Sequence, residues 1–306
     1  MLYVDQPIGT GFSYGTDDAT STLTAAPFVW LFMQAFYTAF PQYANRDFGL
    51  FTESYGGHYG PEFASYFESQ NVAGAGQKIN LVALGINNGW IDPAAQYKAY
   101  ADFAYNNTYK RLITASQYSS YVGAYQSKCL PAMAKCTGLS GSNSACLSAD
   151  STCRNAVESP IESVNDFDVY DIRAPSVDPN PPETYVTYLA SASVVKAIGA
   201  KSTYSECANG PYRKIWNTGD SARSYLDTLA TVVQSGIQVL VWAGDADWIC
   251  NWIGNFDVAN SVNWSGKNIF ASKAVAPYTV GGTLYGEFKS VGNLSWLRVY
   301  DAGHEV

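Results

Sequence analysis

The sequence predicts an α/β fold with a mostly parallel central sheet flanked by helices. Short apolar runs that favour strands alternate with helical stretches near both ends of the chain. One of these runs leads through a glycine-flanked serine directly into a helix. The middle of the chain lacks strong strand signals, so we expect a helical, disulfide-containing cap insertion there. With 306 residues, 47% of them hydrophobic and 14% charged, the chain can bury a large core.

The first part of the expected core, residues 1–91, shows the alternation most clearly. Its strands are short apolar runs bounded by turn residues, and its first helix repeats apolar residues such as Phe28, Leu31 and Phe32 at helical spacing. We expect strands at 1–5, 47–52 and 79–86, and helices at 22–40 and 59–69.

Residues 92–220 interrupt this pattern, and we interpret them as a cap inserted at the upper edge of the sheet. They contain a tyrosine-rich helical stretch at 96–105, four closely spaced cysteines and proline-rich turns near 175–182. The α/β pattern resumes in the second part of the core, residues 221–306. There we expect a helix at 222–235 and strands at 239–243 and 297–300.

The turn at 52–57, which reads TESYGG, has features of the nucleophile elbow of α/β-hydrolases. In such an elbow the serine sits on a strained strand-to-helix turn, and its neighbours are small because the helix packs close behind it. Gly56 stands two positions after Ser54, as the pattern requires. Thr52 stands two positions before it, where the pattern has glycine. Taken alone, the motif also fits an ordinary strand–turn–helix.

A serine hydroxyl becomes nucleophilic when a histidine, held by a carboxylate, removes its proton. The sequence has two histidines. His58 lies on the first turn of the elbow helix, where we expect a packing or surface residue. His304 follows the last expected strand.

The carboxylate is expected after the strand at 239–243, where Asp245 and Asp247 both occur. Asp247 stands three residues after a glycine, as in α/β-hydrolases, and Asp245 is the competing candidate. The order Ser54, Asp247, His304 is the α/β-hydrolase order. Each follows the end of an expected strand, which is where sites form in parallel sheets.

Glu53 immediately precedes the serine, and its charge would repel a developing oxyanion at neutral pH. It fits the site if it is protonated and shares its proton with a second carboxyl group, such as the C-terminal carboxylate of a substrate. That recognition would work at acidic pH and fail as the pH rises. The alternative is a glutamate that hydrogen-bonds the loop backbone.

Composition and charge exclude several function classes. The net charge of −8 and the pI of about 4.7 argue against a nucleic-acid partner. No apolar run approaches the roughly 20 residues that span a bilayer. Zinc sites use cysteine pairs two to four residues apart, usually with a nearby histidine, and the cysteines here are spaced more widely. We therefore predict no metal and no cofactor. The oligomeric state has no signal in the sequence.

Cysteine usage predicts an oxidising location, either secreted or vacuolar and lysosome-like. Disulfides are favoured for the cluster at 129–153, and three N-glycosylation sequons, at Asn106, Asn263 and Asn293, agree with that. Met1 is followed directly by a strand-like run rather than a signal peptide, and the chain stops just after His304. We therefore expect a sequence truncated at both ends.

Four segments together resemble the serine carboxypeptidases, above all the fungal members. They are LYVDQPIGTGFSY at 2–14, TESYGG at 52–57, GDADWICNW at 244–252 and AGHEV at 302–306. The resemblance implies an enzyme that releases C-terminal amino acids from peptides at acidic pH through an acyl-enzyme intermediate. It implies Ser54, Asp247 and His304 as the catalytic triad.

The resemblance also implies roles for neighbouring residues. The backbone N–H of Tyr55 would form half of the oxyanion hole, and Glu53 would recognise the substrate carboxylate. Cys250 resembles the family's free thiol near the site. Glu305 resembles the residue that contacts the released side chain, where an acidic group would tolerate basic C-terminal residues.

The family further suggests a nested pair of disulfides, Cys129–Cys153 around Cys136–Cys146. Cys207 would pair in some relatives with an N-terminal cysteine that this sequence does not contain.

One departure from the family concerns its Asn-Gly-Gly-Pro-Gly segment, which would lie upstream of this sequence. That segment supplies the second oxyanion donor and an asparagine for the substrate carboxylate. Loss of one oxyanion donor typically costs ~10²–10³ in rate. The alternatives are therefore a carboxypeptidase-like acyltransferase or esterase, or an inactive remnant.

Overall fold

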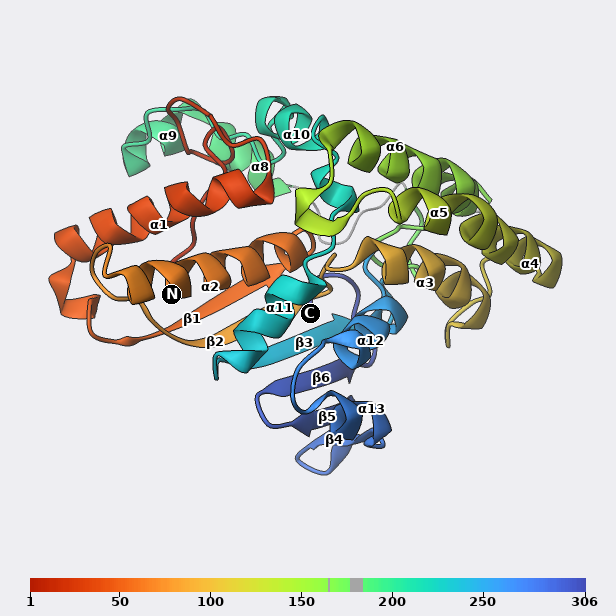
Figure 1. Cartoon of the computed structure of the whole chain (residues 1–306). Coiled ribbons are helices and arrows are strands. Elements are labelled where there is room, and N and C mark those ends of the chain that lie inside the picture. Colours follow the sequence, from red (N-terminus) through yellow and green to blue (C-terminus); the bar gives the residue numbers. More distant parts are fainter. Residues whose placement is uncertain (165, 177–183) are drawn as a thin grey trace.

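The computed structural model describes residues 1–164, 166–176 and 184–306, and it is built around a six-stranded mixed sheet (Figure 1). The strand order is β1-β2-β3-β6-β5-β4. The first four of these are parallel, and β5 and β4 continue the sheet antiparallel. The bounds are β1 Asp47–Glu53, β2 Asn80–Asn87, β3 Gln238–Gly244, β4 Ala276–Val280, β5 Thr283–Val291 and β6 Leu294–Val299. The predicted α/β class is confirmed.

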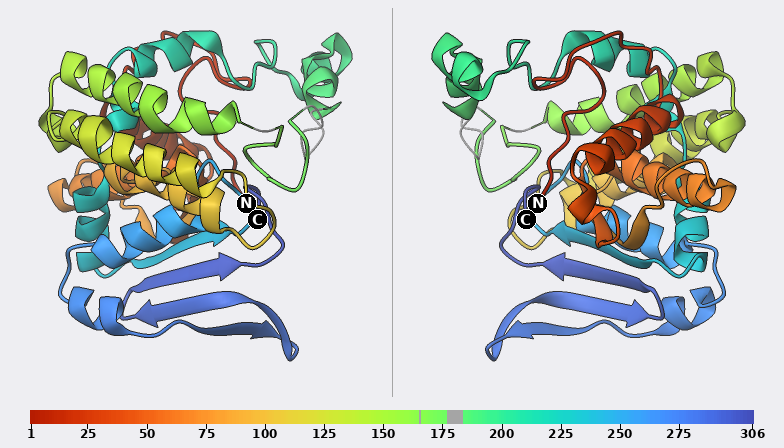
Figure 2. Two further views of the ribbon diagram at one scale, coloured as in Figure 1. Left: turned by 90° about the vertical axis from the view of Figure 1, so that its right-hand side faces the viewer. Right: turned by 90° about the vertical axis from the view of Figure 1, so that its left-hand side faces the viewer.

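The described helices that contact the sheet pack on one of its faces, as Figure 2 shows most clearly. Along β3 and β6 buried residues alternate with half-exposed ones, and the buried set packs against α2, α11, α12 and α13. These helices are α2 Gly56–Ala73, α11 Leu226–Gln234, α12 Trp252–Ser261 and α13 Lys267–Ser272. The opposite face carries exposed apolar side chains, among them Phe51 and Val82. This one-sided burial explains the alternating apolar pattern of the strands.

Helix α1 (Thr22–Ala39) forms where the sequence predicts a helix, but it buries a different face. It begins at a capping box made by Ser21 and Thr24. Leu31 and Phe32, two of the apolar residues at helical spacing, are 60% and 40% exposed. The buried face instead carries Ala25, Ala26, Val29, Trp30, Met33 and Tyr37, which pack toward α2. The helix is apolar on nearly every side, so spacing alone does not select the face that it buries.

Residues 1–5 do not form the strand that the sequence predicts. Their backbone has no regular structure, and Met1 and Tyr3 are exposed. A strand needs a neighbour that accepts and donates its backbone hydrogen bonds, and no strand of the described residues lies beside this segment. The segment leads into a loop in which Gly11 makes an isolated antiparallel bridge to Ser205.

Residues 92–220 contain helices and, within the described part, no strand of the sheet. Two five-residue π-helical turns, Tyr125–Cys129 and Arg154–Glu158, connect α4 to α5 and α6 to α7. The proline-rich turns expected near 175–182 lie mostly outside the described residues. The helices are α3 Pro93–Asn106, α4 Ala115–Ala124, α5 Leu130–Met133, α6 Asn143–Cys153, α7 Ser159–Glu162, α8 Thr184–Ala190, α9 Ala192–Ile198 and α10 Asn209–Trp216.

The hairpin β4–β5 was not among the expected strands. It turns at Gly281 and Gly282, both at positive φ, and a two-glycine turn between strand-forming runs is a typical hairpin signal. The hairpin extends the sheet beyond β6 at the edge opposite β1 (Figure 1).

Candidate active site

Ser54, Asp247 and His304 all follow strands that run parallel in the sheet. Ser54 comes directly after β1, Asp247 three residues after β3, and His304 five residues after β6. Because these strands are parallel, their carboxyl ends meet at one edge of the sheet. The sheet topology therefore brings together the three residues that the sequence predicts for the site.

Ser54 occupies a strained turn between β1 and α2. Its φ of 59° lies in the left-handed region that residues with a side chain seldom adopt. The turn is held by three backbone hydrogen bonds. The Ser54 N–H donates to the Asn87 carbonyl at 3.1 Å, and the Ser54 carbonyl accepts from the N–H groups of Trp90 and Gly57 at 2.8 and 2.9 Å. Strain that is fixed in this way is typical of a nucleophile elbow.

The flanking residues show why the elbow tolerates Thr52 where the usual pattern has glycine. The Thr52 hydroxyl donates to the Gly56 carbonyl at 2.9 Å, so its polar group is satisfied. A Cβ on Gly56 would lie 2.5 Å from the Cβ of Thr52. A Cβ on Gly57 would lie 2.5 Å from the backbone N of Trp90. Glycine is therefore needed at both positions, because the Thr52 side chain lies against Gly56 and the Trp90 backbone lies against Gly57.

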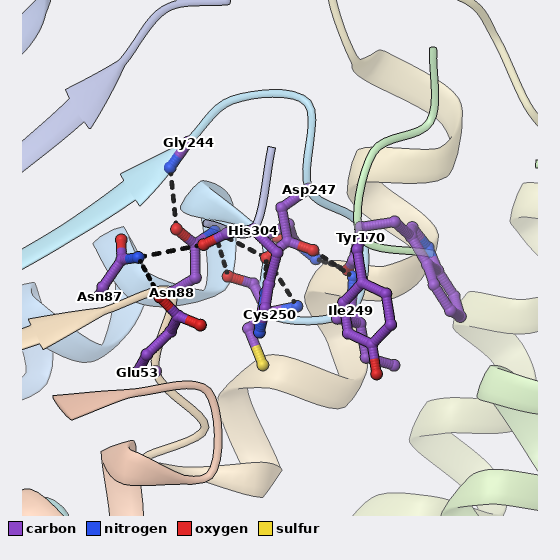
Figure 3. Close-up of polar contacts among 12 residues, drawn as sticks. Glu53, Asn87, Asn88, Tyr170, Gly244, Asp247, Ile249, Cys250 and His304 are labelled. Carbon is purple, nitrogen blue, oxygen red and sulfur yellow. Dashed lines mark hydrogen bonds and ion pairs between the residues drawn. The ribbon is translucent and has the colours of Figure 1, made fainter. Parts of the chain in front are cut away.

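His304 and Asp247 form a buried pair. The Nδ1 atom of His304 lies 2.9 Å from Oδ2 of Asp247. The same oxygen accepts from Nδ2 of Asn88 at 2.6 Å and from the Cys250 N–H at 3.2 Å, while Oδ1 accepts from the Ile249 N–H at 3.0 Å. Figure 3 shows these groups gathered around the His304 ring. These donors fix the position of the carboxylate beside the imidazole.

The surroundings of His304 hold its pKa above the ordinary value of 6.5. Burial lowers the pKa, but the hydrogen-bonded Asp247 carboxylate and the negative charges of Glu53 and Glu305 raise it by more. The ring packs at 5.0 Å from that of Tyr170, whose carbonyl accepts the His304 N–H at 2.8 Å. Its Nε2 atom is buried and has no hydrogen-bond partner among the described residues. That nitrogen is the one available to exchange a proton.

The Cys250 thiol lies near the Ser54 side chain. Burial and the nearby Asp247 charge raise the pKa of this thiol well above its ordinary value, so it stays protonated. The Ser54–His304 hydrogen bond expected of a triad is not formed here. In free enzymes this bond is often loose and tightens when substrate binds.

Asp245, the competing candidate for the acid, is directed elsewhere. Its carboxylate pairs with Arg298 at 3.1 Å and accepts the Asp301 N–H at 3.0 Å. It also accepts a hydrogen bond from the Tyr109 hydroxyl. The Asp245 side chain thus fixes the segment that leads from β6 to His304, while Asp247 contacts the imidazole itself.

Glu53 lies at the exposed side of this group. Its Oε2 accepts from Nδ2 of Asn87 at 3.0 Å, and the same nitrogen donates to the His304 carbonyl at 3.0 Å. Glu53 is therefore bonded to an amide side chain rather than to the loop backbone. Glu305 is exposed, and partial burial together with the Glu53 charge raises its pKa. Beside His304, a cavity of about 390 Å³ is lined by Tyr170, Asp171, Arg173, Glu305 and neighbouring residues.

The structure contains the nested disulfides that the family resemblance suggests, Cys129–Cys153 and Cys136–Cys146. Cys207 is exposed. Both bridges lie in the core that the helical region forms around Trp90 and Trp248. Among the described residues, no group of three or more potential ligands is placed to hold a metal ion. No helix within the described ranges has the length and apolar character needed to cross a bilayer.

The sequons differ in exposure. Asn106 and Asn263 are exposed, whereas Asn293 is half-buried. The side-chain oxygen of Asn293 accepts from Nε2 of Gln238 at 3.0 Å.

Sequence reasoning missed the two asparagines that order the site. Asn87 links Glu53 to the His304 backbone, and Asn88 bonds Asp247 while its Oδ1 accepts the Gly244 N–H at 3.0 Å. Their position directly at the end of β2, beside the ends of β1 and β3, was a usable signal. His58, in contrast, is fully buried, so it is the packing residue of the two alternatives.

Comparison with known proteins places the chain in a family. Residues 1–306 match the serine carboxypeptidase family. The chain is 61% identical over 311 residues to Carboxypeptidase S1 of Penicillium janthinellum, an alignment that covers 100% of this chain and 73% of that protein. It is 33% identical over 322 residues to Carboxypeptidase Y of Schizosaccharomyces pombe, covering 100% of this chain and 32% of that protein.

A solved structure supports the fold. The prohormone-processing carboxypeptidase of Saccharomyces cerevisiae is similar to this chain with a TM-score of 0.80 at 24% identity, covering 98% of this chain and 69% of that one. This structural similarity shows the α/β-hydrolase fold, and the match over residues 1–306 shows the family. The chain belongs to the serine carboxypeptidase family.

Proposed function

We propose that this chain is a serine-type carboxypeptidase that releases C-terminal amino acids from peptides through an acyl-enzyme, with Ser54 as nucleophile, His304 as base and Asp247 as the acid that orients it. The observation that carries the proposal is the buried Asp247–His304 pair, 2.9 Å apart, whose Nε2 remains unpartnered among the described residues. Asp247 follows β3 and His304 follows β6, so the pair lies at the edge of the sheet where β1 ends in the strained Ser54.

The proposed reaction has two stages. The Ser54 Oγ attacks the carbonyl carbon of the last peptide bond while Nε2 of His304 accepts its proton, and Asp247 stabilises the resulting imidazolium. His304 then donates the proton to the leaving amine, which departs as a free amino acid. Water, activated by the same imidazole, hydrolyses the acyl-enzyme. The Tyr55 N–H, which donates to no acceptor in the described part of the chain, is placed to bind the oxyanion.

Glu53 and Asn87 are proposed to select a free C-terminus. A substrate carboxylate beside Glu53 can form a hydrogen bond only if the two carboxyl groups share one proton. Carboxyl groups titrate near pH 4, whereas the pKa of His304 is raised above 6.5. A site that needs a shared carboxyl proton and a neutral imidazole is most populated between these values. We therefore propose a mildly acidic optimum.

Glu305 and Cys250 are proposed to contact the substrate on either side of the cleaved bond. Glu305 lines the cavity beside His304, and a negative charge there would tolerate a basic leaving residue. Cys250, which is buried near Ser54, would border the acyl group.

The surrounding architecture suggests where the protein works. Two disulfides favour an oxidising compartment, so we propose a secreted or vacuolar location. Asn106 and Asn263 are the exposed candidates for glycosylation, and a glycan at Asn293 would have to fit beside the Gln238 contact. Residues 92–220 are proposed as a cap over a core made of 1–91 and 221–306.

A direct assay tests the proposal. The purified chain is incubated at about pH 5 with an N-blocked dipeptide and with the same dipeptide amidated at its C-terminus. We expect release of the free amino acid from the first and little from the second, and no release after Ser54→Ala. Cleavage of an ester without the peptide would instead indicate the esterase or acyltransferase alternative. Full peptide release by Ser54→Ala would overturn the assignment of the nucleophile.

A further inference from the structure

A second buried polar cluster lies behind the nucleophile elbow, outside the triad. Its centre is Asp220, which is fully buried at the start of the 3-10 turn Asp220–Ala222. One carboxylate oxygen, Oδ2, accepts three hydrogen bonds. Two come from Thr22, from its N–H at 3.1 Å and its hydroxyl at 2.7 Å, and the third comes from the Tyr55 hydroxyl at 2.8 Å.

The donors that meet this carboxylate include no cationic side chain. Among the described residues, no lysine or arginine forms an ion pair with Asp220. Thr22 is the first residue of α1, so the carboxylate lies at the positive end of that helix. All three donors meet Oδ2, whereas Oδ1 is buried without a hydrogen-bond partner among the described residues, so the position of the carboxylate is set by Thr22 and Tyr55.

Tyr55 connects this cluster to the reacting centre because it is the residue after Ser54. Its ring is anchored at two points. The hydroxyl is bonded to Asp220, and the face of the ring stacks on His58 with centroids 4.7 Å apart. The main chain of the same residue carries the N–H proposed to bind the oxyanion. Fixing the side chain therefore restricts rotation of the Ser54–Tyr55 peptide.

A second connection reaches the other side of Ser54. Nδ1 of His58 contacts the Trp90 carbonyl at 2.5 Å, and the Trp90 N–H donates to the Ser54 carbonyl at 2.8 Å. Nε2 of the same ring lies 3.2 Å from the Asp220 carbonyl, so His58 contacts the backbone of both Trp90 and Asp220. The His58 ring, on which Tyr55 stacks, is thus fixed to the same backbone that holds the elbow.

We propose that Asp220 is a positioning residue for the reaction at Ser54, acting through the Tyr55 hydroxyl to hold the Tyr55 N–H in the oxyanion geometry. The inference rests on the proposed function. An oxyanion donor is effective only when its distance to the developing charge is fixed, and an error of 1 Å in a catalytic group can cost on the order of 10²-fold in rate. Asp220 touches neither substrate nor the reacting atoms.

A purely structural role for Asp220, as an acceptor for Thr22 at the start of α1, makes a different prediction. The carboxylate accepts hydrogen bonds from Thr22 and from Tyr55, so variants at these two residues separate the structural role from the positioning role. Tyr55→Phe removes the hydroxyl and leaves the ring on His58. Thr22→Val removes a hydroxyl of the same carboxylate and leaves Tyr55 bonded. Asp220→Asn keeps an oxygen that can accept from Tyr55 and removes the charge.

The experiment compares these variants in three measurements: kcat and KM on the blocked dipeptide, the second-order rate of Ser54 labelling by a fluorophosphonate, and the thermal midpoint. For Tyr55→Phe we expect kcat and the labelling rate to fall at least ~10-fold while KM changes less than about twofold. For Thr22→Val we expect a lower thermal midpoint with kcat within about twofold, because only the hydroxyl bond between the start of α1 and Asp220 is lost. Asp220→Asn should lie between Tyr55→Phe and the unsubstituted chain in kcat.

Two results would overturn the proposal. One is a Tyr55→Phe variant with unchanged kcat and labelling rate. The other is an equal fall of kcat in Tyr55→Phe and Thr22→Val, which would indicate general loosening of the fold. Labelling of Ser54 does not require peptide cleavage, so the inference stays testable even if the unsubstituted chain fails to cleave the dipeptide. Failure of the proposed function and failure of the positioning role are thereby distinguished.

Discussion

His304 and Asp247 face each other across 2.9 Å between Nδ1 and Oδ2, and Asn88 donates to the same carboxylate oxygen at 2.6 Å. The amide of Asn88 fixes the carboxylate, and the carboxylate fixes the imidazole with Nε2 on the far side of the ring from Asp247. The chain of contacts continues from Oδ1 of Asn88 to the Gly244 N–H at the end of β3. The orientation of the proposed base is therefore set by the ends of two neighbouring strands.

Exchange of the carboxylate for an amide tests this relationship. Asp247→Asn keeps the shape of the side chain but presents a neutral group to Nδ1, so the imidazolium loses its partner. We expect kcat to fall on the order of 10³–10⁴-fold with KM nearly unchanged. The measurement is steady-state cleavage of the blocked dipeptide.

Asp245→Asn is the matched control, since it makes the same chemical change two residues away. It removes the charge that pairs with Arg298, so we expect a lower free energy of unfolding but a kcat within about tenfold. If Asp245→Asn proved the more damaging to kcat in a folded protein, Asp245 would be the acid and the assignment of Asp247 would be wrong.

The pH dependence of kcat/KM should differ between two substrates. For an ester without a free carboxylate, only the imidazole must be deprotonated, so the rate rises with pH. The midpoint of this rise lies above 6.5, because the Asp247, Glu53 and Glu305 charges together outweigh burial and raise the pKa of His304. For a peptide with a free carboxylate, the loss of the shared carboxyl proton adds a decline at higher pH. The same alkaline decline in both substrates would contradict a role for carboxylate recognition.

Glu53→Gln should shift the rise and the alkaline decline of the kcat/KM profile in opposite directions. The amide donates a hydrogen bond to the substrate carboxylate without needing a proton, so the alkaline decline in peptide cleavage should move to higher pH. Because the Glu53 charge helps to raise the pKa of His304, the rising limb measured with the ester should move to lower pH. The measurement is kcat/KM across pH 4–9 for both substrates. Profiles unchanged in both limbs would remove Glu53 from the site.

The two disulfides should differ in their contribution to stability. In the chain-entropy account, a bridge across 24 residues contributes about 3–4 kcal/mol, and one across 10 residues about 2–3 kcal/mol. The pair Cys129→Ala and Cys153→Ala should therefore lower the free energy of unfolding more than Cys136→Ala with Cys146→Ala. Urea unfolding of the two double variants measures the difference. The opposite order would show that local packing outweighs loop closure.

The sequence predicts that Ser54, Asp247 and His304 lie at one edge of the sheet, and this holds because the signals are topological. Ser54, Asp247 and His304 each follow a strand-like run, and parallel strands bring their ends to one edge whatever the details of packing. The predictions that were wrong concern segments whose structure depends on contacts with distant parts of the chain, which a local pattern does not show. Residues 1–5 are apolar but lie beside no strand of the described chain.

Other misses have the same physical cause. The exposure of Leu31 was not predictable from a helix that is apolar on most sides. Asp220 carries no local sign of its importance, because its partner Thr22 is 198 residues away. Asn88 was visible at the end of a strand, but its role depends on Asp247, which belongs to another part of the core.

The most direct test of the account is the site of covalent labelling by a fluorophosphonate. The chain is treated with the probe, digested and mapped by mass spectrometry, alongside His304→Ala and Ser54→Ala. The account predicts a single adduct on Ser54 that is strongly reduced in His304→Ala and absent in Ser54→Ala. A folded chain that acquires no adduct, or acquires one on another residue, would contradict Ser54 as the activated nucleophile.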